Sequence, residues 1–262
     1  MKKNITKGRN ISNSKKKPQD SDGHGTFLAG IIAAKTNSKK GIAGASFFGN
    51  LKIMPLKFNF TTDQAISAIN YAKARNIPII NASWGAYREE GLDLVLKNTI
   101  AAYPGTFVTA AGNGDCDSSG ETGVGCNHDS GTLNDRMYPC DFDLANIICV
   151  GASGKDGALT EYSDYGALSV DVSAPGGTDS DPVFGLGLKK NKYTEAEGTS
   201  LSVAYVAAEA GLIMSKKPSL SASQIIEIIK NSVDLEPSFA GKTLTGGKVN
   251  FQKALQLAVT SY

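Results

Sequence analysis

Three short motifs in the sequence place a polar residue among small ones. His24 lies in GHGT, Asn113 in AAGN and Ser200 in GTS. Each motif alone has a simpler explanation, because His24 and Ser200 suit the start of a helix and Asn113 suits a turn. Together they supply the base, the oxyanion donor and the nucleophile of an acyl transfer.

The chemistry follows from the groups themselves. A serine hydroxyl attacks an amide only when a neighbouring imidazole takes its proton, so His24 is the candidate base for Ser200. The tetrahedral oxyanion needs hydrogen-bond donors, which the Asn113 amide and the backbone N–H of Ser200 would provide. Ser200 would also open a helix, whose first N–H groups favour negative charge.

Alternating short apolar runs and helical periodicity follow residue 51, a pattern typical of a parallel sheet with crossover helices. We expect one α/β domain. The expected strands are 51–58, 77–83, 106–111, 146–152 and 169–174, and the expected helices are 63–75, 89–102, 199–216, 221–232 and 250–260.

Charge divides the chain unevenly. Residues 1–19 carry seven of the 27 basic residues and no acidic one, so we expect a flexible N-terminal segment. Residues 20–262 then hold 20 basic against 25 acidic residues, which disfavours nucleic-acid binding. No apolar run reaches the roughly 18 residues of a membrane span. No apolar stretch follows the early lysines, so we expect no signal peptide in this chain.

A glycine- and aspartate-rich stretch without periodicity, 113–140, is expected to be a long surface loop. It holds Cys116, Cys126 and Cys140, and Cys149 follows on a predicted strand. Four cysteines can pair in three ways, and we favour the pattern that joins neighbours in the sequence, Cys116 to Cys126 and Cys140 to Cys149.

Zinc binding is the alternative use of these cysteines, because His128 follows Cys126 by two residues. The absence of a CxxC spacing makes zinc the weaker hypothesis. Disulfides imply an oxidising compartment, so we expect a secreted protein or one in an oxidising lumen.

The motifs HGTFLAG, NASWGA, AAGN, SAPGG and EGTSLSVAYVAA, taken in order, resemble the signatures of the subtilisin-like serine proteases, the subtilase or peptidase S8 family. The resemblance covers roughly residues 19–260. It implies a three-layer αβα fold with a doubly wound, mostly parallel sheet, and a catalytic domain over 20–262. It also implies a serine endopeptidase that forms an acyl-enzyme on Ser200, with His24 as base and Asn113 in the oxyanion hole. Phe27 departs from the family, which usually has a histidine after HGT.

The same resemblance implies that an extended peptide binds along the cleft, with a propeptide as a further partner outside this chain. Peptide pairing of this kind is β-augmentation and tolerates many sequences. The residues expected to line the cleft and the two sides of its first specificity pocket are Ser83, Trp84, Gly85, Ala110, Ala111 and Gly112.

The family's third catalytic residue is an aspartate at the end of the first core strand. No acidic residue precedes Asp20, so we expect that strand and its aspartate to be missing here and the domain to be N-terminally incomplete. Asp20 and Asp22 lie close to His24, but we do not expect either to hold its imidazole. One hypothesis is an endopeptidase whose Asp-bearing strand lies upstream of Met1. The alternative is a pseudoprotease that acts as a binding or scaffold protein.

The chemistry predicted here needs no cofactor and no metal. Many subtilases bind structural calcium in a loop that corresponds to residues 35–41. Asn37 suits such a site, but Lys39 and Lys40 would repel a cation, so calcium is not expected there.

Overall fold

The structure is a computed structural model that describes residues 4–36, 41–46, 51–87, 92–114, 116, 123–189 and 192–260. A six-stranded sheet forms its centre, in the order β11-β12-β8-β7-β5-β3. The strands from β3 to β12 pair in parallel, and β11 joins antiparallel at one edge. Their bounds are β3 (Ile79–Ala82), β5 (Thr106–Ala110), β7 (Ile147–Ser153), β8 (Val172–Pro175), β11 (Asp234–Leu235) and β12 (Gly247–Lys248).

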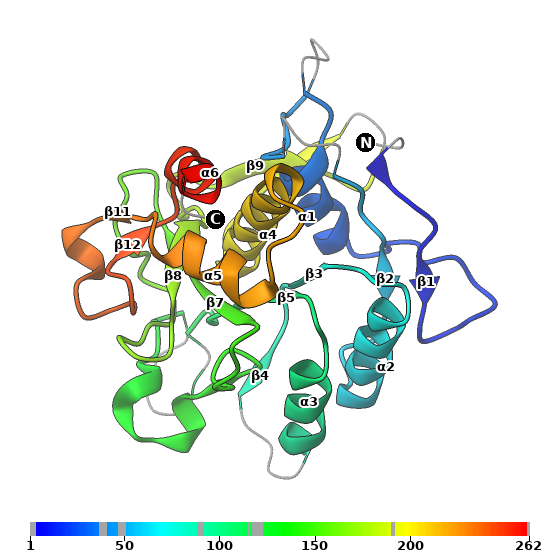
Figure 1. The fold of residues 1–262 in the computed structure, drawn as a ribbon, viewed down its shortest axis with the longest axis horizontal. Helices are drawn as coiled ribbons and strands as arrows, with labels where there is room; N and C mark the ends of the chain where they lie inside the picture. Colours follow the sequence, from blue (N-terminus) through cyan, green and yellow to red (C-terminus); the bar gives the residue numbers. More distant parts are fainter. Residues whose placement is uncertain are drawn as a thin grey trace.

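Helices cover both faces of this sheet, which gives the three-layer αβα arrangement expected from the motifs (Figure 1). One face carries α4 (Thr199–Lys216), with α1 (His24–Ala33), α5 (Ala222–Lys230) and α6 (Phe251–Thr260) packed around it. The other face carries α2 (Thr62–Lys73) and α3 (Leu92–Ala101), which pack on each other.

Alternating side chains on the central strands supply both cores. Val108 and Ile148 lie opposite each other in register and belong to the cluster that packs against α4. Their neighbours Phe107 and Ile147 belong to the cluster that includes Ile69 of α2 and faces the other way. A strand buried on both faces reads as a continuous apolar run, which is why the sequence identified β5 and β7.

The predicted strand 51–58 departs most from expectation. Only β2 (Leu56–Lys57) forms, and it pairs in parallel with β1 (Arg9–Asn10) instead of joining the main sheet. The backbone N–H of Arg9 donates to Pro55 O at 3.0 Å, and that of Ile11 donates to Lys57 O at 2.7 Å. Within the segment 1–19, which the sequence predicts to be flexible, these backbone bonds and the burial of Asn10 attach the part that pairs with β2 to the domain.

The described part of the stretch 113–140 is partly buried, with Cys126, His128 and Cys140 inside the protein. It contains the short 3-10 helices His128–Ser130 and Leu133–Asp135, and β6 (Met137–Tyr138) pairs with β4 (Ala86–Tyr87). A separate hairpin, β9 (Val183–Leu186) with β10 (Tyr193–Ala196), packs against α1.

Both expected disulfides form. Cys116 bonds to Cys126 with their Cα atoms 6.3 Å apart, and Cys140 bonds to Cys149 at 5.1 Å. The zinc hypothesis loses its thiolate ligands, because all four sulfurs are in disulfides.

The candidate calcium loop cannot be described in full, since residues 37–40 lie outside the described residues. Within the described chain, none of the helices has the length and apolar character needed to cross a bilayer.

Glu209 on α4 is fully buried, and neither of its carboxylate oxygens has a hydrogen-bond partner among the described residues. Burial raises the pKa of this carboxyl from its ordinary 4.5 to about 8. The folded state thus favours the protonated form, so the contribution of Glu209 to the free energy of unfolding is most favourable below pH 4.5, falls as the pH rises towards 8 and then levels off.

We predict that Glu209→Gln relieves this cost at high pH. The free energy of unfolding of the variant, relative to the unsubstituted chain, should rise by roughly 2–4 kcal/mol between pH 4 and pH 9. Urea denaturation across that range measures the difference. Glu227→Gln, at an exposed position of α5, is the matched control and should show no such trend. A pH-independent difference for Glu209→Gln would contradict the prediction.

Candidate active site

Ser200 is the second residue of α4, and the backbone of Gly198, two residues before it, is hydrogen-bonded to two partners. Gly198 has a φ of 134°, a conformation that favours glycine, and its N–H donates to Gly176 O at 3.0 Å and lies 3.0 Å from the Tyr162 hydroxyl. These contacts fix where the helix begins. In the first turn the N–H of Thr199 is bonded to Asn113 Oδ1 and that of Leu201 to Gly198 O, so the N–H of Ser200 is the candidate donor to a negative charge at this helix start.

Ser83, which directly follows β3, is hydrogen-bonded to Ser200 in both directions. Ser83 Oγ donates to the backbone oxygen of Ser200 at 2.8 Å, and Ser200 Oγ donates to the backbone oxygen of Ser83 at 3.4 Å. Asn81 Nδ2 donates in turn to Ser83 Oγ at 2.9 Å. In this structure the hydroxyl of Ser200 therefore bonds to β3 backbone, and no hydrogen bond to His24 is formed among the described residues.

Asn113 is oriented by the start of α4. Its Oδ1 accepts hydrogen bonds from the backbone N–H of Thr199 at 2.9 Å and from Thr199 Oγ1 at 2.8 Å. Because a backbone N–H can only donate, the oxygen of the amide must face Thr199. The Nδ2 donor of this exposed residue consequently points away from Thr199.

His24 is the first residue of α1 and follows Gly23, whose φ is 118°. Burial lowers the pKa of its half-buried imidazole below 6.5, and the negative charges of Asp22 and Asp20 offset only part of that effect. A lowered pKa keeps the ring neutral at pH 7, which is the state that accepts a proton.

The two nearby aspartates bind backbone rather than the imidazole. Asp20 accepts hydrogen bonds from the N–H of Gly23 at 2.9 Å and from the N–H and hydroxyl of Thr26 at 2.8 and 2.6 Å. Asp22 Oδ1 accepts from the backbone N–H of His24 at 3.1 Å. Burial by itself would raise the pKa of Asp20, but the hydrogen bonds from Thr26 and Gly23 keep it below its usual value.

A cleft of about 550 Å³ joins the three predicted residues. His24, Asn113 and Ser200 all line it. Glu197 and Leu188, at and near the β9–β10 hairpin, form another part of its wall. Glu197 opens the motif EGTSLSVAYVAA, but the β9–β10 hairpin itself has no motif, so this wall was not predicted from the sequence.

The expected substrate-binding residues lie outside the lining of this cleft. Ser83 is buried against Ser200, and Trp84 packs edge-on against Phe107 with ring centroids 6.3 Å apart. A methyl group added at Gly85 would lie 2.8 Å from the Met137 side chain.

On the opposite segment, Ala110 ends β5 and Ala111 is buried. Gly112 has a φ of 127°, and a methyl group there would lie 2.1 Å from an Asp164 oxygen. Close backbone packing explains both glycines.

The family departure at Phe27 has a structural explanation. Its ring packs on Gly185 of β9, where a methyl group would lie 2.4 Å from it. The aromatic ring thus holds the hairpin that walls the cleft.

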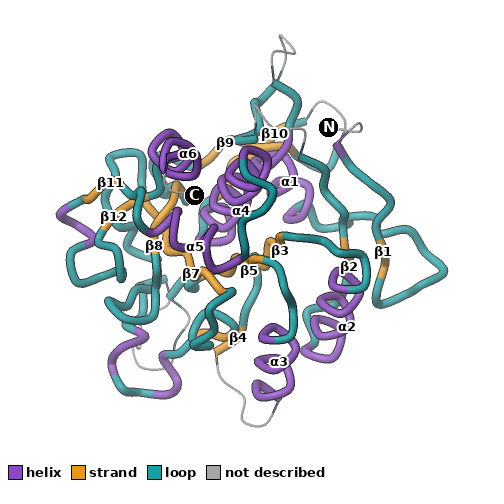
Figure 2. Tube along the Cα trace, in the orientation of Figure 1, coloured by secondary structure: helices purple, strands orange, loops and turns teal. Residues whose placement is uncertain are grey.

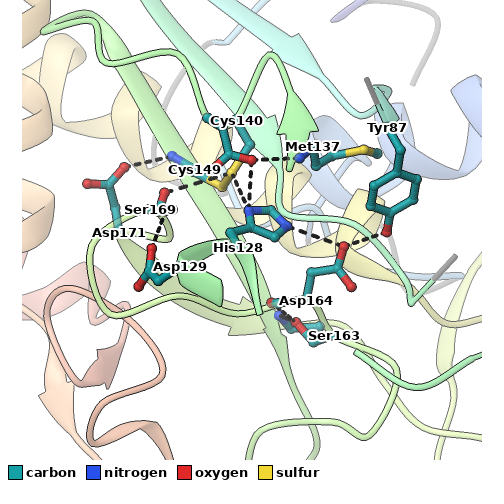
Figure 3. The surroundings of a disulfide bond; sticks show 12 residues. Tyr87, His128, Asp129, Met137, Cys140, Cys149, Ser163, Asp164, Ser169 and Asp171 are labelled. Carbon is teal, nitrogen blue, oxygen red and sulfur yellow. Dashed lines mark hydrogen bonds and ion pairs between the residues drawn. A yellow bond between two sulfur atoms is a disulfide. The ribbon is translucent and has the colours of Figure 1, made fainter. Parts of the chain in front are cut away.

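A buried ionic cluster near the site was not foreseen from the sequence (Figure 3). His128 lies 3.0 Å from Asp141 and 3.4 Å from Asp164, with its side chain fully buried. Burial alone would lower the pKa of His128, but hydrogen bonds to Asp141 and Asp164 raise it to about 9. Its proximity to Cys126 in the sequence suggested zinc, whereas the structure uses it as a buried cation.

The model of the subtilase family, Peptidase_S8, matches residues 1–253. Subtilisin DY of Bacillus licheniformis is 30% identical over 90% of this chain and 79% of its own length. Thermitase of Thermoactinomyces vulgaris is 30% identical over 91% of this chain and 77% of its own length. Subtilisin-like protease 3 of Plasmodium falciparum is 29% identical over 92% of this chain, which spans 32% of that protein.

Solved structures agree on the fold. A protease of Pseudoalteromonas arctica superposes with a TM-score of 0.78 at 24% identity, covering 97% of this chain and 84% of its own. The chain belongs to the subtilase family. Its relatives support serine protease function in general and peptide or protein substrates, and its two disulfides are consistent with an oxidising environment.

We predict that Asp20→Ala destabilises the domain by about 1–2 kcal/mol, because the start of α1 loses the acceptor for the Gly23 and Thr26 donors. Urea denaturation at pH 7 measures the loss. Asp22→Ala is the matched control, since Asp22 accepts only the His24 N–H, and it should cost clearly less. Equal losses in the two variants would show that Asp20 does not cap the helix.

Proposed function

We propose that this protein is a serine endopeptidase that forms an acyl-enzyme on Ser200. The observation that carries the proposal is the orientation of Asn113, whose Oδ1 is held by Thr199 so that Nδ2 remains as a donor at the cleft that contains Ser200 and His24. A fold kept only for its shape has no need of a base, a hydroxyl and a preset donor at one cleft.

In the proposed reaction each group acts once during acylation and once during deacylation. Ser200 Oγ attacks the peptide carbonyl carbon while His24 takes the hydroxyl proton. The oxyanion is bound by Asn113 Nδ2 and by the backbone N–H of Ser200. His24 then gives its proton to the departing amine as the C–N bond breaks. Water repeats the sequence on the acyl ester and frees Ser200.

Substrate binding is proposed for the segments 83–85 and 110–112, as the family resemblance implies, with an extended peptide between them. We also propose that the protein is secreted or resides in an oxidising lumen, because its disulfides are stable in an oxidising compartment.

The imidazole-orienting carboxylate is the open part of the mechanism. Asp20 and Asp22 are engaged with backbone N–H groups, and neither is bonded to the His24 ring. Without such a carboxylate a catalytic histidine can adopt the wrong tautomer, and in trypsin, one of the standard examples, the loss is about 10⁴-fold in kcat. This observation favours the second candidate, a pseudoprotease that binds without cleaving.

Two strand edges support an external source for that carboxylate. Among the described residues, β3 pairs only with β5 and β2 pairs only with β1, although β2, α2 and β3 follow one another along the chain. In the view of Figure 2 the β1–β2 pair lies beyond β3, along the direction of the sheet. We propose that a strand N-terminal to residue 1 pairs with these edges and brings an aspartate to His24.

We predict that a fluorophosphonate probe labels the protein on Ser200. Ser200→Ala should abolish labelling, because Ser200 is the proposed nucleophile at the cleft that it shares with His24. Ser215→Ala is the matched control on the same helix, where the hydroxyl bonds only to Leu212 O, and it should be labelled normally. Mass spectrometry locates the adduct.

Adding an upstream strand that carries aspartate should raise the labelling rate and the thermal midpoint together. If the extended protein melts cooperatively but shows neither Ser200-dependent labelling nor peptide hydrolysis, the endopeptidase proposal fails and the pseudoprotease takes its place.

A further inference from the structure

The buried carboxylate of Asp164 is hydrogen-bonded beside both segments that are proposed to flank the cleft (Figure 3). Asp164 is fully buried, and its Oδ1 accepts hydrogen bonds from the backbone N–H of Gly114 at 2.9 Å and of Cys126 at 2.8 Å. Its Oδ2 accepts the hydroxyl of Tyr87 at 2.5 Å. Gly114 follows Asn113 directly, and Tyr87 follows the segment 83–85 by two residues.

The backbone of Asp164 holds the other side of Asn113. Its N–H donates to the carbonyl oxygen of Gly112 at 3.1 Å. Asp164 therefore binds the residue before Asn113 through its backbone and the residue after it through its side chain. Gly112 has no room for a side chain on this face, which shows how closely the two chains approach.

The His128 imidazole lies between Asp164 and a second carboxylate and offsets part of their negative charge (Figure 3). His128 places Nε2 3.4 Å from Asp164 Oδ2 and Nδ1 3.0 Å from Asp141 Oδ2. Asp141 Oδ2 also accepts the N–H of Met137 at 2.6 Å. An unpaired buried carboxylate is costly, so an imidazolium between two of them makes the Asp164 charge tolerable at this depth.

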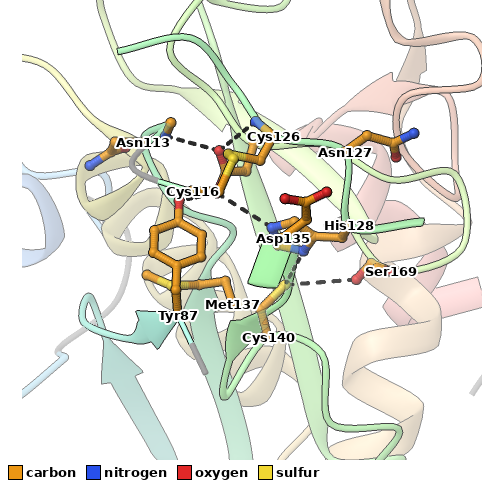
Figure 4. A network of polar contacts seen from close by, with 12 residues as sticks. Tyr87, Asn113, Cys116, Cys126, Asn127, His128, Asp135, Met137, Cys140 and Ser169 are labelled. Atoms are coloured by element: carbon orange, nitrogen blue, oxygen red, sulfur yellow. Dashed lines mark hydrogen bonds and ion pairs between the residues drawn. A yellow bond between two sulfur atoms is a disulfide. The ribbon is translucent and has the colours of Figure 1, made fainter. Parts of the chain in front are cut away.

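Asn113 lies at the edge of this network, beside the Cys116–Cys126 disulfide (Figure 4). Its side chain is bonded to Thr199 at the start of α4, and its backbone neighbours are bonded to Asp164. Both ends of the proposed oxyanion donor are thus fixed before substrate arrives.

We propose that Asp164, charge-balanced by His128, is a positioning residue that holds segment 112–114 so that the Asn113 amide is preset for the oxyanion. The catalytic part of this inference rests on the proposed function. A donor set in place before reaction stabilises the transition state without reorganisation, whereas the ground-state complex gains little. Loosening the segment should therefore reduce kcat more than it raises KM.

The kinetic test compares Asp164→Asn and His128→Gln with a substitution at a partly buried aspartate. Asp171→Asn is the control, because Asp171 also accepts a backbone N–H, that of Cys149 at 2.8 Å. Its other oxygen lies 3.4 Å from Lys230 Nζ, and neither partner lines the cleft. We expect kcat for peptide hydrolysis, or the rate of serine labelling at saturating fluorophosphonate, to fall about 10- to 100-fold in both test variants with KM changed less than about twofold. Asp171→Asn should leave kcat unchanged even if it melts earlier.

A second measurement does not need activity. Amide hydrogen exchange of Asn113 and Gly114 should become at least about tenfold faster in Asp164→Asn and His128→Gln than in Asp171→Asn. If neither this chain nor the extended protein shows Ser200-dependent chemistry, the proposed function fails and the exchange data alone decide the positioning role. Unchanged exchange at Asn113 and Gly114, or equal kcat losses in all three variants, would overturn the inference.

Discussion

The start of α4 is the constraint on which the site depends. Gly198 is bonded to the Gly176 carbonyl, Ser200 to the end of β3, and Thr199 to the Asn113 amide. Three strand ends and one helix end thus share a few hydrogen bonds, so none can shift alone. Parallel strands make this arrangement possible, because their carboxyl ends all meet at one edge of the sheet where the helix N-terminus supplies unpaired N–H groups.

Buried and half-buried carboxylates take the same role at several places around that edge. Asp20 binds N–H groups at the start of α1, and Asp164 binds those beside Asn113. Each converts a loop without regular structure into a fixed one, because an ionised acceptor forms stronger bonds than a neutral carbonyl. Glu209 is the contrasting case, because it is buried without partners and so carries only the cost of burial.

Local signals made much of this predictable from the sequence. Helix 199–216 and the Ser221 start of the next helix follow from periodicity and a capping box, and both disulfides join cysteines close in sequence. What escaped prediction depends on distant partners. The strand at 51–58 was expected in the main sheet, but its pairing is decided by the basic N-terminal residues. His128 meets Asp141 and Asp164 only through the fold, so no spacing announced the cluster.

The described chain fixes the side chain of Asn113 by hydrogen bonds but not the ring of His24. The Asn113 amide is fixed at its side chain by Thr199 and along its backbone by Asp164. The His24 backbone is fixed by Asp22, yet its ring has no bonded acceptor among the described residues. A neutral imidazole without an acceptor is not held in one tautomer, since either nitrogen can carry the proton. The described chain thus fixes the amide of Asn113, the proposed oxyanion donor, whereas its described residues give the ring of His24, the proposed base, no bonded acceptor.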